Sequence, residues 1–159
     1  MPRALPILAV LLLALPALAQ GTVGFGGGDF DGDAPVEVAA DSLEVDQATG
    51  RAVLTGNVVI AQGDLRLSAA RVEVAYATGA GADRRIERLN ATGDVLIVAG
   101  EDAAEGQEAV YTLGTSEILM TGDVLVTQDG ATLAGDRLAV NLATGSGTVS
   151  GRVRTTLQP

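Results

Sequence analysis

The side chains able to do chemistry in this 159-residue sequence are carboxylates, hydroxyls, two tyrosines and arginines. Cysteine, histidine and tryptophan are missing, and all ten basic residues are arginine. Catalysis by a histidine base, thiol chemistry, Schiff-base lysines and zinc sites built from His or Cys are therefore excluded. The sequence indicates no cofactor and no metal, and we predict that the protein is not an enzyme.

Carboxylates alone support two further chemistries. A glycoside hydrolase needs two acids facing one cleft, whereas the acids here fall mostly at turns and at outward positions of predicted strands. A calcium loop built on Asp29, Asp31 and Asp33 lacks the glycine and the bidentate glutamate of an EF-hand loop, because Ala34 and Ala40 occupy those positions. Neither chemistry is favoured.

The charge and aromatic content argue against nucleic acid as a partner. Twenty acidic residues against ten arginines give a net charge of −10, and the chain has only two Phe and two Tyr. Such a surface repels phosphates and offers few rings on which bases could stack.

The first nineteen residues have the layout of a secretory signal peptide. Arg3 precedes an uncharged, mostly apolar run from Ala4 to Ala19, which ends in Ala-Leu-Ala before Gln20. As a helix this run would reach only about 24 Å, short of a hydrocarbon core of about 30 Å. We therefore expect cleavage after Ala19 and export past the inner membrane.

The remaining chain divides by composition. Residues 20–34 are rich in Gly and Asp without any period, which predicts a flexible leader. Residues 35–154 form the expected domain, and 155–159 a C-terminal tail. Within the domain, apolar and polar residues alternate with period two, as in "DLRLSAARVEVAY", and frequent Gly and Asx turn signals predict strands of about five to eight residues. The fold class is all-β.

The pattern also repeats. "TGNVVIAQGDLRLSAARVEV" at 55–74 has a near copy, "TGDVLVTQDGATLAGDRLAV", at 121–140. Gly56, Gly93, Gly122 and Gly151 close successive units and are 37, 29 and 29 positions apart. This spacing predicts stacked hairpins, each covering the apolar face of the next. Their inner faces either close into a dry core or leave a slot for a flexible apolar ligand.

The quoted repeats, with "DSLEVDQATGRAVLTG" before them, resemble the OstA-like (LptA) family of periplasmic lipopolysaccharide-transport proteins. The resemblance covers about residues 36–153 and implies a twisted antiparallel β-jellyroll that is open at both ends. It also implies that lipid A acyl chains of lipopolysaccharide travel in an apolar trough. The implied partners are the inner-membrane and outer-membrane transport components, with head-to-tail homo-oligomers that pair through edge strands.

The resemblance assigns roles to three sets of residues. The set expected to face lipid in the trough is Val58, Ile60, Leu65, Leu67, Val72, Val74, Val95, Ile97, Val124, Val126, Leu138 and Val140. The set expected at the docking edges is Val36, Val38, Leu43 and Val45 on the first strand, and Val149 and Val153 on the last. Three arginines, Arg84, Arg85 and Arg88, are candidates to meet headgroup phosphates, and a solvated turn is their alternative role.

Two other functions fit the same sequence. One is an exported structural or adhesive β-repeat protein with no lipid cargo. The other is the membrane-anchored component of the same transport pathway, in which the N-terminal segment is not cleaved.

Overall fold

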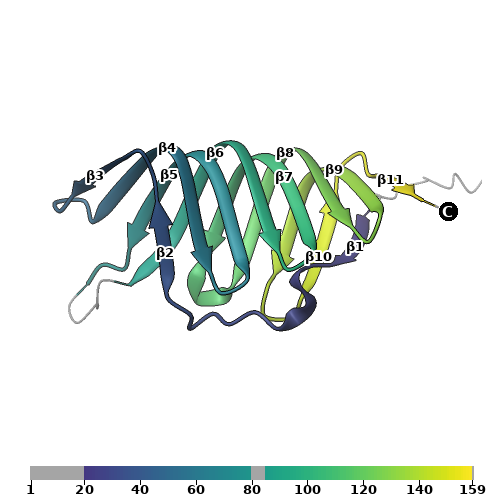
Figure 1. Cartoon of the computed structure of the whole chain (residues 1–159), viewed down its shortest axis with the longest axis horizontal. Coiled ribbons are helices and arrows are strands. Elements are labelled where there is room, and N and C mark those ends of the chain that lie inside the picture. Colours follow the sequence, from purple (N-terminus) through teal and green to yellow (C-terminus); the bar gives the residue numbers. More distant parts are fainter. Residues whose placement is uncertain (1–19, 80–84, 159) are drawn as a thin grey trace, which may run out of the picture.

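The computed structural model describes residues 20–79 and 85–158 and consists almost entirely of strands (Figure 1). Two short 3-10 turns, η1 (Gly26–Gly28) and η2 (Leu113–Thr115), accompany them. No helix among these residues is long and apolar enough to cross a membrane. The strands are β1 (Gln20–Gly24), β2 (Val36–Ala39), β3 (Ser42–Asp46), β4 (Arg51–Gln62), β5 (Leu65–Tyr76), β6 (Ile86–Ala99), β7 (Asp102–Thr112), β8 (Glu117–Gln128), β9 (Ala131–Asn141), β10 (Ser146–Ser150) and β11 (Arg154–Leu157).

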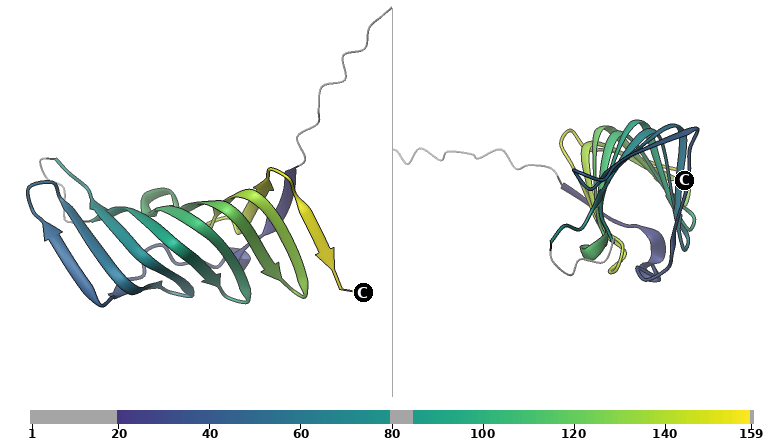
Figure 2. Two further views of the ribbon diagram at one scale, coloured as in Figure 1. Left: turned by 90° about the horizontal axis from the view of Figure 1, so that it is seen from above. Right: turned by 90° about the vertical axis from the view of Figure 1, so that its left-hand side faces the viewer.

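All eleven strands belong to one antiparallel sheet, in which β4 to β9 pair with their neighbours in chain order. The sheet bends sharply along a line that we call the corner, and its two halves face each other as two arms (Figure 2). The β3 arm begins with β3 and ends with β10 and β1, whereas the β2 arm begins with β2 and ends with β11. Each strand from β4 to β9 crosses the corner and belongs to both arms, so the all-β, open jellyroll-like fold is confirmed.

The corner depends on pairs of residues in the left-handed backbone region. Gly93 and Asp94 in β6 have φ of 82° and 45°, and Gly122 and Asp123 in β8 have 85° and 46°. The same pair of conformations occurs at Gly56–Asn57 in β4 and at Gly151–Arg152 after β10. A Cβ on Gly93 would lie 2.8 Å from the Cβ of Ala70, so glycine is required both for the conformation and for the close approach.

These Gly pairs correct the predicted strand lengths. Frequent Gly and Asx signals, with Thr-Gly dipeptides among them, predict turns that end strands of about five to eight residues, yet β4 to β9 contain 11 to 14 residues each. Three of these dipeptides, Thr55-Gly56, Thr92-Gly93 and Thr121-Gly122, lie at bulges inside strands, where the register shifts. Thr49-Gly50 and Thr144-Gly145 lie in turns between strands, as predicted. A bulge with positive φ bends a strand without ending it, so the repeated unit is a pair of bent strands.

The predicted leader and tail are also corrected. Residues 20–24 form β1, which pairs with β10, and Phe25 is buried with 1% of its surface exposed. Residues 155–157 belong to β11, which pairs with β9. Both segments satisfy backbone groups at the same end of the sheet. The leader then continues along the side opposite the corner to reach β2, which lies at the other end (Figure 1).

We expect Gly93→Ala to lower the free energy of unfolding by about 2 kcal/mol or more, because the new Cβ combines left-handed strain with a contact against Ala70. Gly114→Ala is the matched control, since a Cβ there meets nothing within 4 Å. Urea unfolding followed by circular dichroism measures both. Equal midpoints for the two variants would contradict the role assigned to the corner.

Candidate functional site

The candidate site is the inner surface between the two arms, which we call the trough. Cross-strand partners share one face of a sheet, so the pairing register shows which side chains form continuous rows. In the β3 arm two such rows run from β3 at one end of the sheet to β1 at the other. The row nearer the corner is Leu43, Leu54, Val72, Ala91, Ala109, Met120, Leu138, Val149 and Gly21. The next is Val45, Ala52, Val74, Leu89, Tyr111, Ile118, Val140, Gly147 and Val23.

The β2 arm supplies the facing row. The side chains of this row are apolar from one end of the sheet almost to the other, and the last is a threonine. They are Val38, Ile60, Leu67, Ile97, Ala104, Val126, Leu133 and Thr155.

At the corner, valines alternate with very small residues. Val95 pairs with Gly106 and Val124 pairs with Gly135. A Cβ on Gly106 would lie 2.6 Å from Cγ of Met120, so the space at the corner is narrow. The trough is therefore wider away from the corner, where larger side chains occupy it.

All twelve residues predicted to face lipid lie on this inner surface. Each is exposed by 4% or less, and together they belong to one hydrophobic cluster. The structure thus brings them into a single apolar interior. In the chain as folded, protein side chains pack this interior.

One buried polar contact joins the arms inside the trough. Gln62 on the β2 arm is 3% exposed, and its Oε1 accepts a hydrogen bond of 2.8 Å from the hydroxyl of Tyr111 on the β3 arm. Its Nε2 donates to the carbonyl oxygens of Gly32 and Ala34 at 2.9 and 3.1 Å. Burial raises the pKa of Tyr111 to about 12. Alternation of apolar and polar residues does not predict this hydrogen bond between Tyr111 and Gln62.

The inner rows end uncovered at the N-terminal end of the sheet. Leu43 and Val45 on β3 are 59% and 60% exposed, and Val38 on β2 is also exposed. Val36 is half-buried and pairs with Gln62. Because β2 and β3 each pair only with β4, their other edges carry free backbone groups beside apolar side chains. The predicted first strand is thus two strands, β2 and β3, one on each arm, and both follow β1 in the chain. Their docking role stays a prediction.

The C-terminal end differs from the expectation at both residues, because neither Val149 nor Val153 lies on an edge strand. Val149 is fully buried, because β10 lies between β9 and β1. Val153 lies between β10 and β11 and packs against the core. The edge strands at this end are β1 and β11, and Leu157 on β11 is exposed.

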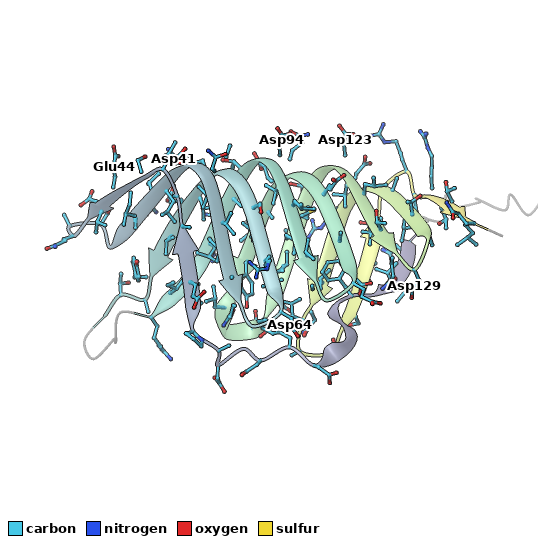
Figure 3. The ribbon with its side chains drawn as sticks, viewed as in Figure 1. Asp41, Glu44, Asp64, Asp94, Asp123 and Asp129 are labelled. Atoms are coloured by element: carbon cyan, nitrogen blue, oxygen red, sulfur yellow. The ribbon has the colours of Figure 1, made fainter. Side chains whose placement is uncertain are left out.

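The arginine candidates do not form one cluster. Arg84 lies outside the described residues. Arg85 and Arg88 are exposed, and Arg88 lies with Arg137 beside a depression of about 470 Å³ on the outer face of the β3 arm. Within residues 20–79 and 85–158, no three acidic side chains come together as metal ligands. Acids instead line the outside, as Asp41, Glu44, Asp94 and Asp123 do along the corner (Figure 3).

An apolar trough between two arms of one bent antiparallel sheet, with free edges at both ends, defines the class of open β-jellyrolls of the OstA type. The family described as LptA/(LptD N-terminal domain) LPS transport protein matches residues 37–146. An uncharacterized protein of Rhizobium meliloti (strain 1021) is 30% identical over 161 residues, which cover 96% of this chain and 87% of that protein.

A solved structure has the same fold. It is LptH of Pseudomonas aeruginosa, described as the LptA-homologous periplasmic component of the lipopolysaccharide transport device. The TM-score is 0.72 at 22% identity, with 81% of this chain and 99% of that chain covered. The chain belongs to the LptA/(LptD N-terminal domain) family of lipopolysaccharide-transport proteins.

We expect Tyr111→Phe to lower the free energy of unfolding at pH 7 by about 1 to 3 kcal/mol, because it leaves the buried Oε1 of Gln62 without a donor. The wild type alone should lose further stability at high pH. An unfolded tyrosine loses its proton near pH 10, whereas folded Tyr111 keeps it to about pH 12. Stability from the neutral hydroxyl is therefore complete below pH 10 and falls by up to about 3 kcal/mol as the pH rises through 12.

Urea unfolding at pH 7, 10 and 11.5 tests both effects. The difference in stability between wild type and Tyr111→Phe should narrow above pH 10. Parallel decline of the two proteins would show that Tyr111 is not the group that titrates.

Proposed function

We propose that this protein is a periplasmic lipopolysaccharide carrier that holds lipid A acyl chains in the trough and delivers them from the inner to the outer membrane. The observation that carries the proposal is the set of inner rows, which are almost wholly apolar from one end of the sheet to the other. We further propose that export removes residues 1–19, so that Gln20 at the start of β1 is the first residue of the mature chain.

The physical need for such a trough comes from the acyl chains. Exposing a chain of about a dozen methylenes to water costs on the order of 10 kcal/mol at about 0.8 kcal/mol each. A protein that carries such chains through water must replace that contact with its own apolar surface. No catalytic group is required, because no bond is made or broken.

Delivery across a compartment requires a path that is longer than one molecule. The free edges at both ends of the sheet support end-to-end assembly into such a path. The N-terminal end would pair with the C-terminal end of another copy, or with a membrane component, through strand addition. The exposed inner residues of β2 and β3 would then continue the apolar rows across the junction. The trough becomes continuous through the assembly.

Labelling with lipopolysaccharide whose acyl chains carry a diazirine tests the cargo, using the unmodified protein. After illumination, peptide mass spectrometry should find label on Ile60 and Val126, which face the trough, and not on Val59, which is 36% exposed on the outer face. Equal labelling of Val59 and Ile60, or none inside, would favour a structural or adhesive protein without cargo. The intact mass of the exported protein tests the membrane-anchored alternative. A mass that corresponds to a chain starting at Gln20 would rule that alternative out.

Replacing Leu43 and Val45 together with Thr should weaken self-association about tenfold or more while the fold remains. Threonine keeps strand propensity but removes much of the apolar surface that the free edge offers to a partner. Sedimentation velocity over a range of concentrations measures the change. Glu44→Gln is the matched control, since Glu44 lies on the same strand but pairs with Val53 on the outer face. Equal association constants for the two variants would exclude this edge.

A further inference from the structure

Residues 25–34, which we call the strap, lie along the side of the trough opposite the corner. In the end-on view of Figure 2 this dark purple segment leaves β1 on one arm and reaches the other arm on the open side. It crosses from the β3 arm to the β2 arm at its start. The amide of Phe25 donates to the carbonyl of Gly145 on the β3 arm at 2.8 Å, and the amide of Gly26 donates to Asp102 Oδ2 on the β2 arm at 2.9 Å.

The middle of the strap also lies between the arms. The carbonyl of Gly32 accepts the hydrogen bond from Gln62 on the β2 arm, and a Cβ on Gly32 would lie 3.4 Å from Ser116 Oγ in the turn after η2, on the β3 arm. The strap therefore covers the open side at two places. Its attachments are single hydrogen bonds, in contrast to the continuous ladder of the arms.

The strap supplies one side chain to the interior that does not come from the bent strands. Phe25 is the only buried residue among the described positions before β4. Phe30 is half-buried and packs against the same cluster. The space left beneath the strap, beside Phe30 and Leu65, is only about 120 Å³, well below the roughly 300 Å³ at which ligand pockets begin.

The composition of the strap makes it the element whose detachment from the trough costs the least free energy. Gly26, Gly27 and Gly28 all have positive φ and lose much chain entropy when ordered. Asp29 and Asp31 on the strap lie beside Asp64 in the turn of the β2 arm, so charges of one sign face each other. By contrast, opening any bent strand would break a ladder of backbone hydrogen bonds.

We infer that the space held by Phe25 under the strap is an acyl-chain site, and that the strap is a cover that an entering acyl chain displaces. The inference rests on the proposed function, since it names where the cargo of the trough enters. Phe25 occupies the site in the empty protein, which keeps the apolar interior closed to water. Entry is sideways, along the open side of the trough, as well as from its ends.

A reversible disulfide tests the inference, because the natural chain has no cysteine. Gly32→Cys with Ser116→Cys places the two sulfurs within reach of a bridge from strap to β3 arm. This variant is labelled with diazirine-bearing lipopolysaccharide in its oxidised and reduced forms.

The oxidised form should label Ile60 and Val126 at least fivefold less than the reduced form, and the reduced form should match wild type. Equal labelling of oxidised and reduced protein would overturn the strap proposal while leaving the carrier proposal intact. If the wild type itself acquires no label inside the trough, the carrier proposal fails instead.

Phe25→Ala tests whether the Phe25 ring occupies the acyl-chain site in the empty protein. With the ring removed, acyl chains should label the trough about threefold faster than in wild type. An unchanged or slower rate would show that Phe25 is not what the acyl chain replaces.

Discussion

The structure depends on the absence of a side chain where alternate strands, β4, β6 and β8, turn the corner. At Gly93 and Gly122 the backbone takes a left-handed conformation, and the neighbouring strand lies too close to admit a Cβ. Because these pairs recur on alternate strands, every bent strand turns at the same line, and the sheet folds lengthwise without losing its ladder. Two apolar faces are then held opposite each other along the whole molecule.

This arrangement makes the interior both a core and a candidate carrier site. A sheet with one apolar face must bury that face to be stable, and here each arm buries the other. Stability and transport therefore compete for the same surface, since a cargo chain can enter only where protein contacts give way. The continuous ladder holds the arms, whereas the strap contributes Phe25 through a Gly-rich segment with few bonds. Because the bent strands stay in place while Phe25 of the strap can be displaced, the same interior can serve both stability and transport.

The sequence was sufficient to predict the all-β class and the inner face, because alternation with period two is a local property. The family resemblance placed residues such as Ile60 and Val126 in the trough, and both are buried on the inner face. It could not show that a Thr-Gly dipeptide bends a strand, because the same dipeptide is equally typical of a turn. The sequence also did not reveal that residues 20–34 are ordered, because β1 and Phe25 form their backbone hydrogen bonds with residues about 120 positions away in the chain. The signal that could have found it is the presence of Phe25 and Phe30, half of all aromatic residues, in a segment interpreted as a flexible leader.

Charge explains how an acidic protein could hold an anionic lipid. The net charge is −10, yet the three apolar rows contain no ionisable group except Tyr111, whose hydroxyl burial keeps neutral. Asp102 lies at the margin of the inner face, where it accepts the hydrogen bond from Gly26. The carboxylates lie outside, along the corner and at the turns of the open side, where Asp64 and Asp129 are found (Figure 3). A phosphate-bearing headgroup left outside the trough would therefore meet repulsion rather than attraction. Affinity must then come from burial of the acyl chains, and added salt, which screens exposed charges within about 10 Å at 0.1 M, should not weaken binding. A carrier of the kind proposed would hold its cargo by the acyl chains and leave the headgroup accessible to the next protein in the path.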